Sequence, residues 1–242
     1  MREKITQLGE NFQKYFEIVF AKSEEQKNSA YHVRHKVYCE ELGFESIQKD
    51  KREIDEYDAD SLHLLLRSKK TGEFIGCTRI IFPCVNKPGY LLPIEKVCTF
   101  DNSKFDLTTI PRNKLAEVSR LAVIADYRRR KSDSKDAISI SPADFSIQKE
   151  QRFPYIPVSL YLGTMKLAHI HGIEYLFVLT EKRLAQHFSK LGFDITLIGK
   201  SIEHRGTRVP SLVCINSSIS KMHLPLHSLY QIIAQDLEMC MK

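Results

Sequence analysis

Apolar residues recur every three or four positions near the start of the chain, at Leu8, Phe12, Tyr15, Phe16, Val19 and Phe20. Residues at this spacing lie on one face of a helix, so the pattern predicts an amphipathic helix at 6–21. Residues 23–29 are polar and are expected to form a break between two elements. A second helix is predicted at 30–42, because Gly43 follows it and glycine is common just after a helix end.

Two apolar runs further on, at 62–67 and 74–82, flank the polar segment 68–72. Strand-like runs joined by a short segment that contains glycine indicate a β-hairpin. Residues 83–111 contain four prolines and little periodicity, so they are expected to be irregular. The next apolar run, at 115–125, predicts a third strand.

The chain is polar at 127–157, which has the character of an arm inserted into a domain rather than a linker between two domains. Helical and strand-like patterns then alternate. Helices are expected at 158–172, 181–191 and 226–239, and strands at 173–180, 194–200 and 211–215. This order predicts an α/β (α+β) fold in which helices flank a mixed central sheet, rather than a doubly wound parallel sheet.

Composition narrows the class of protein. At 242 residues with 43% hydrophobic and 27% charged residues, the chain is expected to form one domain, 1–242. Its start lacks a secretory signal, no apolar run could span a bilayer, and a cytoplasmic location is expected. The six cysteines include no Cys-x-x-Cys pair, so no metal site is expected. The net charge of +6 favours an acidic partner, but no nucleic-acid-binding module accompanies it.

Charged residues occur in two strands where apolar residues are expected. Arg79 lies within 74–82, and Glu117 and Arg120 lie within the third predicted strand. An unpaired buried ion costs several kcal/mol, so these side chains either pair with one another or line a water-filled cleft. A structural ion-pair cluster and a functional pocket both explain them. A β-bulge near Val118 would bring Glu117 and Arg120 to one side of the sheet despite their odd spacing.

A second group of polar residues lies upstream. Arg34 and Tyr38 share one face of the second predicted helix. Asp55 and Asp58 lie in 48–60, which is charged and expected to be a loop. Taken alone, these residues fit a solvated loop beside a surface arginine.

Four motifs follow one another in order: Tyr31-His-Val-Arg-His-Lys-Val-Tyr-Cys-Glu-Glu-Leu-Gly-Phe44, Asp55-Glu-Tyr-Asp58, Arg79 and Ala116-Glu-Val-Ser-Arg120. Together they resemble the motif set of the autoinducer-synthase-like acyltransferases of the GNAT-like superfamily. The likeness is greatest to the N-acyl amino acid synthases and the PEP-CTERM/exosortase-associated acyltransferases. It extends from about residue 31 to residue 215, which is most of the chain.

The resemblance implies a role for each matching residue. Glu117 corresponds to the family's candidate general base, and Arg79 and Arg120 complete the catalytic group. Residues 1–60 correspond to a helical flap over the cleft. Substrate-binding residues are expected to be Arg34, Tyr38, Asp55, Asp58, Ser119 and Thr180.

The sequence departs from the family pattern in the region that binds the acyl donor. Users of acyl-coenzyme A with this fold usually hold its diphosphate on a glycine-rich turn that opens a helix. No glycine occurs between Gly89 and Gly163, and a basic stretch stands there instead. This favours docking of the acidic acyl carrier protein, although such a stretch is also typical of a solvated surface. The expected docking residues are Arg128, Arg129, Arg130 and Lys131.

Other departures concern the leaving group and the acceptor. Phe188 stands where the last helix of related enzymes often carries a tyrosine acid, so no acid is assigned to the leaving thiolate. The chain has no tryptophan, whereas homoserine-lactone synthases typically carry one in the flap. Tyr38 and Phe44 lie in the corresponding region and fit an amino-acid acceptor better.

These observations predict an N-acyltransferase that moves a long-chain fatty acyl group from acyl carrier protein, or from acyl-coenzyme A, to an amino acid. An acyl-phosphopantetheine thioester is the co-substrate, and no other cofactor and no nucleic-acid partner are expected. Acyl-homoserine-lactone synthesis from S-adenosylmethionine remains an alternative, as does a non-catalytic basic binding protein. The C-terminal helix is expected to pack on the sheet, as amphipathic helices of this length usually do, with dimerisation or peripheral membrane contact as alternatives.

Overall fold

The computed structural model describes residues 2–84, 89–128 and 156–241. Within these residues, eight strands form a central sheet in the order β1-β2-β3-β4-β5-β8-β6, with β7 paired to β8. All neighbours are antiparallel except β4 and β5, which are parallel, so the predicted mixed sheet is confirmed. The strands are β1 (Phe16–Phe20), β2 (Ser61–Ser68), β3 (Phe74–Ile81), β4 (Leu115–Val123), β5 (Tyr175–Thr180), β6 (Ile195–Leu197), β7 (Ile202–Glu203) and β8 (Thr207–Cys214).

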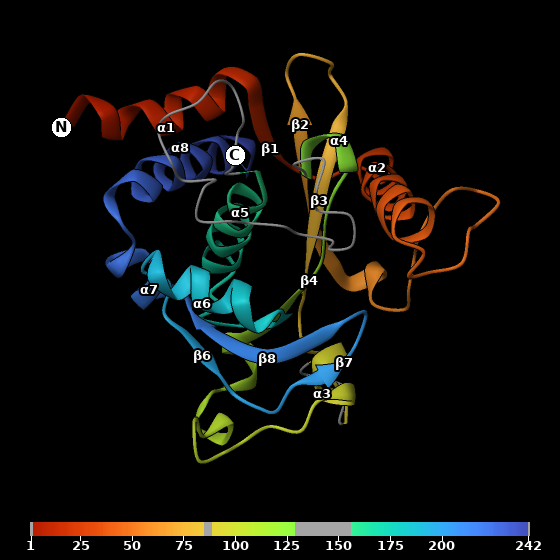
Figure 1. The fold of residues 1–242 in the computed structure, drawn as a ribbon, viewed down its shortest axis with the longest axis vertical. Helices are drawn as coiled ribbons and strands as arrows, with labels where there is room; N and C mark the ends of the chain where they lie inside the picture. The colour runs from red at the N-terminus through yellow and green to blue at the C-terminus, as the bar shows by residue number, and fades with distance from the viewer. Residues whose placement is uncertain (1, 85–88, 129–155, 242) are drawn as a thin grey trace.

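Helices cover both faces of the sheet (Figure 1), with α2 on one side of β3 and α5 on the other. Helix α8 packs on α5 and α1. Among the described residues, no helix is long and apolar enough to cross a bilayer. The α-helices are α1 (Arg2–Tyr15), α2 (Glu24–Arg34), α3 (Pro93–Val97), α4 (Ala125–Arg128), α5 (Ile156–Ile170), α6 (Lys182–Lys190), α7 (Ile215–Lys221) and α8 (Leu224–Met241); a π-helix, η1 (His35–Glu41), and the 3₁₀ turns Asp58–Asp60, Leu107–Thr109 and Arg112–Lys114 complete the set.

The predicted first helix is wrong in its second half. The chain leaves α1 at Tyr15 and continues as β1, whose residues pair with β2 from Phe16–Ser68 to Phe20–Leu64. The segment is made of aromatic and β-branched residues, which favour strands, and Phe16 and Ile18 alternate into the core. Pairing with the edge of the sheet therefore overrides the helical spacing.

The predicted polar break at 23–29 is also wrong, because it contains the start of α2. Ser23 caps this helix by accepting a hydrogen bond from the backbone N–H of Gln26, whose side-chain oxygen in turn accepts one from the backbone N–H of Ser23. This reciprocal pair is a capping box, which begins a helix within a polar sequence. The helix then continues into η1, so the predicted C-terminal part is helical up to Glu41.

Most of the other predicted elements are present. The hairpin forms as β2 and β3, and the third predicted strand forms as β4. Residues 83–111 are less irregular than expected, because α3 begins with Pro93, a residue suited to the first turn of a helix. The short β7 and α7 were not predicted. Most of the expected arm at 127–157 lies outside the described residues.

Candidate active site

A cavity of about 300 Å³ opens where β4 and β5 part. The two strands pair from Leu115–Tyr175 to Val118–Val178, and both chains then continue without further pairing to each other. Residues past this point, Ser119 to Leu121 on β4 and Leu179 and Thr180 on β5, form facing walls of the cavity. A separation of neighbouring strands leaves main-chain polar groups available to a ligand.

A β-bulge shapes the β4 wall. Cys77 of β3 lies opposite Ala122, but Arg79 lies opposite Ser119, so β4 holds one more residue than β3 over this interval. Arg120 occupies the extra position with φ of +54°, in the left-handed region. The bulge therefore lies two residues beyond the expected position, and it leaves both Glu117 and Arg120 lining the cavity.

Glu117 is the most perturbed carboxyl group of the cavity. Its side chain is only 3% exposed and its Oε2 accepts a hydrogen bond of 2.8 Å from the backbone N–H of Ile94, at the start of α3. Burial raises the pKa of Glu117 to about 8, although this hydrogen bond and the charge of Arg79 act in the opposite direction. Near neutral pH the group can therefore exchange a proton, as a general base must.

Three arginines and three carboxylates form one ion network behind and beside Glu117. Arg34 contacts Asp58 at 2.6 and 3.0 Å and also Glu53. Arg79 contacts Asp55 at 2.6 and 2.7 Å and Asp58 at 2.6 Å. Arg120 contacts Asp55 at 2.9 Å and Glu53 at 3.1 Å. Because equal numbers of charges are paired through bidentate contacts, the network can be buried without a net charge.

The network has an inner part and an outer part. Asp55, Arg79 and Arg120 line the cavity, whereas Arg34 and Asp58 are not among the described residues that line it and are 1% and 2% exposed. Burial alone would raise the pKa of Asp58, but Arg34 holds it well below its usual range. Of the residues predicted to bind substrate, Arg34, Asp55 and Asp58 thus lie in this network, and of these three only Asp55 lines the cavity.

Glu53 is a member of the network that the sequence did not single out. It bridges Arg34 and Arg120, which belong to the N-terminal flap and to the β4 bulge. The only sequence signal was its position in the charged loop. Several acidic residues lie there, and the sequence does not show which of them joins the network.

Tyr38 and Ser119 lie between the network and the cavity. The hydroxyl of Tyr38 donates a hydrogen bond of 2.9 Å to the main-chain carbonyl of Leu121, and the guanidinium of Arg120 lies 6.0 Å from its ring centre. Ser119 Oγ accepts a hydrogen bond of 2.9 Å from Nε of Arg79. Both side chains therefore fix the β4 wall rather than move freely in the cavity.

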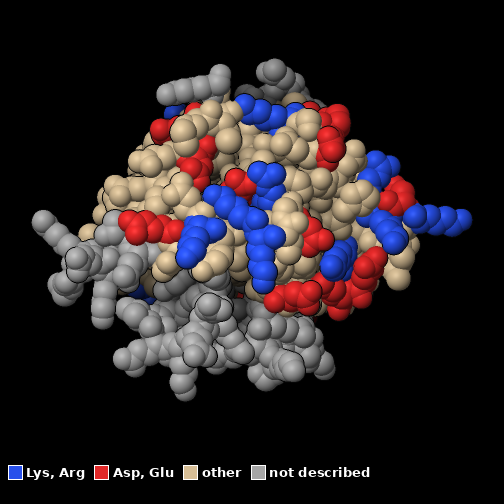
Figure 2. All heavy atoms as spheres, turned by 90° about the horizontal axis from the view of Figure 1, so that it is seen from above, with Lys and Arg blue, Asp and Glu red and all other residues tan. Residues whose placement is uncertain are grey.

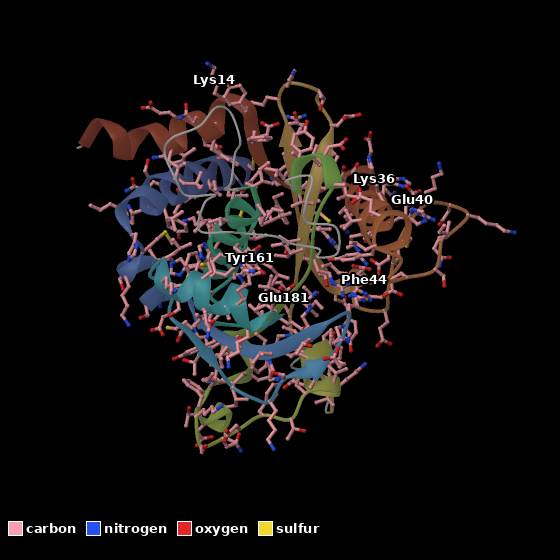
Figure 3. All side chains as sticks on the ribbon, viewed as in Figure 1. Lys14, Lys36, Glu40, Phe44, Tyr161 and Glu181 are labelled. Atoms are coloured by element: carbon pink, nitrogen blue, oxygen red, sulfur yellow. The ribbon has the colours of Figure 1, made fainter. Side chains whose placement is uncertain are left out.

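The opposite wall carries a tyrosine that was not predicted. Tyr161 of α5 lines the cavity together with Thr180 of β5. Figure 3 shows Tyr161 near Glu181 and across from Phe44 at the centre of the molecule. Burial raises the pKa of Tyr161, so its phenol stays protonated and can act only as a hydrogen-bond donor or acceptor. In the sequence it was one aromatic residue in an apolar helix.

An apolar recess continues the cavity beyond Tyr161 and Thr180. It measures about 20 Å³ and shares Val118, Val178, Tyr161 and Thr180 with the main cavity. Its other walls are almost entirely apolar and come from α5, α6, the turn after α6 and the strands β5, β6 and β8: Thr164, Met165, Leu176, Phe188, Phe193, Ile195 and Val213. Phe188, which replaces the expected tyrosine, is part of this apolar surface.

The expected docking stretch lies almost wholly outside the described residues. Arg128 ends α4, and Arg129, Arg130 and Lys131 follow it in the part that is not described. On the face shown in Figure 2, a group of basic side chains lies near the middle of the described surface, with acidic side chains around it. Among the described residues, no group of three or more His, Cys, Asp or Glu side chains is placed to hold a metal ion.

Comparison with known proteins agrees with this geometry. Residues 33–135 match the family described as acetyltransferase (GNAT) domain. No curated protein is a significant sequence match.

Solved structures of acyl-group synthases share the fold. The acyl-homoserine-lactone synthase LasI is 17% identical with a TM-score of 0.57, over 85% of this chain and 94% of LasI. BjaI, a coenzyme-A-dependent acyl-homoserine-lactone synthase, is 17% identical with a TM-score of 0.55, over 92% and 89%. FeeM, an N-acyl amino acid synthase from uncultured soil microbes, is 16% identical with a TM-score of 0.55, over 88% and 96%.

Proposed function

We propose that this chain is an acyltransferase of the GNAT fold that transfers a long-chain fatty acyl group from acyl carrier protein to the amino group of an amino acid. The product is an N-acyl amino acid. The observation that carries this proposal is the buried Glu117, whose pKa is raised to about 8 at a cavity between parted strands. Attack on a thioester needs a neutral amine, and such a carboxylate can remove the proton.

The reaction requires one proton transfer at each end. The neutral amine nitrogen attacks the thioester carbonyl carbon while Glu117, directly or through water, takes one proton from this nitrogen. The carbonyl oxygen then carries negative charge, which the main-chain N–H groups of the β4 bulge can stabilise. When the C–S bond breaks, the thiolate sulfur takes a proton from water, and the phenol of Tyr161 on the same cavity wall can donate a hydrogen bond to it.

The apolar recess supplies a place for the acyl tail. Its almost wholly apolar lining favours transfer of a hydrocarbon chain from water. The recess is narrow, so a long chain enters only as side chains move aside, and Met165 has the flexible, adaptable side chain that such a movement needs. The recess begins next to Tyr161 and Thr180, where the thioester carbon would lie.

The acyl donor is proposed from the sequence around α4. A glycine-rich diphosphate turn is missing and Arg128-Arg-Arg-Lys131 stands in its place, which favours an acidic carrier protein over coenzyme A. BjaI shows that a protein of this fold can be coenzyme-A-dependent. The donors therefore need a direct comparison.

The experiment is an in vitro reaction with palmitoyl-acyl carrier protein or palmitoyl-coenzyme A and each of the twenty amino acids, read by mass spectrometry. We expect an amide product, formed with a higher kcat/KM from the carrier-protein donor. Absence of an amide with every acceptor and both donors would exclude the proposal. A higher kcat/KM with coenzyme A would retain the acyl transfer and overturn the choice of donor.

Acyl-homoserine-lactone synthesis is the second candidate, because LasI and BjaI share the fold to the same degree as FeeM. The missing tryptophan and the presence of Tyr38 and Phe44 beside the cavity favour an amino acid. Adding S-adenosylmethionine to the same reaction separates the two, since only the lactone route releases methylthioadenosine.

A further inference from the structure

The hairpin of β7 and β8 brings three basic side chains to the cavity: His204, Arg205 and Arg208. The hairpin turns tightly, with Glu203 paired to Thr207 and the N–H of His204 bonded to the carbonyl of Gly206 at 2.9 Å. Nothing in the four sequence motifs includes this hairpin. The hairpin therefore contributes separately to the cavity. It comes from the C-terminal part of the chain, whereas the flap is N-terminal.

Arg205 is held in an unusual backbone conformation. Its backbone angle φ is +55°. Among the described residues, the other non-glycine residues with a positive φ are Lys51 and Arg120. Such a conformation is costly for a residue with a Cβ atom and concentrates at functional sites. Two of these three residues are thus arginines that line the cavity.

Both of these arginines lie against the same ring. The guanidinium carbon of Arg205 is 5.6 Å from the ring centre of Tyr38, and that of Arg120 is 6.0 Å from it. Arg208 is fixed next to them, because its Nη2 donates a hydrogen bond of 2.9 Å to the main-chain carbonyl of Arg205. The two hairpin arginines therefore present a prearranged pair of guanidinium groups to the cavity.

Each hairpin arginine holds a carboxylate in the structure. Arg205 pairs with Glu45, in the flap loop that follows η1, and Arg208 pairs with Glu181, at the start of α6. These carboxylates are 35% and 28% exposed, so either can move to solvent at small cost. Burial, together with the charges of Arg34 and Arg208, lowers the pKa of Arg205. The pair thus gains from an additional anion.

We propose that Arg205 and Arg208 bind the α-carboxylate of the acceptor amino acid, with Arg205 exchanging Glu45 for it. This inference rests on the proposed N-acyltransferase function and names the part of the acceptor that the site recognises. The planar fork of a guanidinium matches a carboxylate, and replacing one carboxylate by another keeps the local charge balanced. Glu117 lines the same cavity, so one molecule with a carboxylate and an amine can contact both ends.

The test compares an amino acid with the amine that lacks only its carboxylate, for example tyrosine with tyramine. Arg205→Asn removes the guanidinium and suits the turn, because asparagine tolerates positive φ. Arg208→Gln removes the second one. Each variant should raise KM for tyrosine by about 10- to 100-fold, the range expected for lost hydrogen bonds to a charged group, and leave KM for tyramine within about twofold.

Arg67→Gln is the matched control, since Arg67 is an exposed strand arginine that pairs with Glu17 on the far edge of the sheet. Arg205→Lys should restore part of the preference for tyrosine over tyramine. The inference is overturned if Arg205→Asn and Arg208→Gln leave this preference unchanged. It is also overturned if they raise KM for the acyl donor instead, which would assign the pair to the phosphate of phosphopantetheine.

Failure of the proposed function is recognised separately, because the wild type then forms no amide with any acceptor. Calorimetric titration of tyrosine and tyramine into the wild type and the two variants still tests the carboxylate site. Binding of tyrosine that the variants lose supports the site, and equal binding by all proteins rejects it.

Discussion

The hydroxyl of Tyr38 and the main-chain carbonyl of Leu121 are joined by a hydrogen bond of 2.9 Å. Tyr38 belongs to η1, in the N-terminal flap, and Leu121 lies in the bulged part of β4. The bond therefore fixes the flap to the strand whose main-chain groups face the cavity. A π-helix often marks a functional site, and here it brings this phenol to the bulge.

Tyr38→Phe should reduce kcat by about 10-fold, with little change in KM for the donor, because the bulge loses one of the contacts that fix its peptide groups. The variant should also unfold at a slightly lower temperature, since the buried carbonyl of Leu121 loses its partner at a cost of about 1–3 kcal/mol. Steady-state kinetics and thermal unfolding measure the two effects. Tyr127→Phe is the control, because the hydroxyl of Tyr127 donates a hydrogen bond of 3.4 Å to Ser68 and neither residue lines the cavity. Equal kinetic effects in both variants would remove the positioning role.

Glu117→Gln should lower kcat by about 10²- to 10⁴-fold, the usual contribution of a general base, with a smaller effect on binding of the carrier protein. Its pKa of about 8 predicts that the wild type gains activity as pH rises to about 8 and then reaches a plateau. Below that value the ionised fraction falls about tenfold per pH unit. The ratio of wild-type to variant rates at each pH cancels the titration of the acceptor amine. A ratio that does not change between pH 6 and 9 would contradict the assignment.

The same carboxyl group makes a prediction about stability. The pKa of Glu117 is raised from 4.5 to about 8, so the folded state binds more protons than the unfolded state between these values. Stability from this group is therefore present below pH 4.5 and is lost as pH rises through about 8. Glu117→Gln removes the dependence, so the melting temperature of the variant should rise relative to the wild type from pH 5 to pH 8. Scanning calorimetry across this range checks the sign, and a difference that falls with pH would refute the raised pKa.

The sequence predicted the sheet because its strands carry strong local patterns. The hairpin of β2 and β3 has two apolar runs around Gly72, and β4 has a long apolar run. Strand β1 was not predicted, because its five residues also fit the spacing of the preceding helix. Only its pairing with β2 distinguishes a strand from a helix here. The start of α2 was not predicted, because it lies in a polar segment where a capping box begins the helix. Local patterns cannot show such long-range pairing.

The candidate site was predicted in part for a similar reason. Arg79, Glu117 and Arg120 were visible because a charge in a buried strand is unusual. Glu53, Tyr161 and Arg205 carried no such signal, since acidic loops, helical aromatics and surface arginines are common. Their positions at the cavity or in the network depend on the fold alone.

Asp58→Asn should destabilise the protein by about 3–5 kcal/mol at neutral pH, because it leaves Arg34 and Arg79 with less than their full complement of buried negative charge. The pKa of Asp58 is held well below its usual value of 3.8 by Arg34, so the wild type begins to lose this advantage as pH falls below 3.8 and loses it fully below the lowered pKa. Urea unfolding at pH 7 and at pH 3 measures both. Asp50→Asn, in an exposed pair with Arg52, should have almost no effect, and a similar loss in both variants would argue against the buried network.

Val213→Leu should shift the preferred acyl chain toward shorter lengths by about one or two carbons. Val213 lies on β8, is buried and lines the apolar recess, so a larger side chain shortens the space available to the tail. One methylene in an apolar pocket changes kcat/KM by about 10- to 200-fold, which is enough to reorder a series of donors. The measurement is a competition among acyl carrier proteins loaded with chains of 10 to about 18 carbons, a range chosen to span medium and long tails. Val209→Leu, at a buried position of the same strand that is not among the described residues of the recess, controls for overpacking of the sheet. If both variants keep the wild-type preference, the acyl tail binds outside the recess. If both variants shift the preference equally, the recess does not determine the acyl chain length.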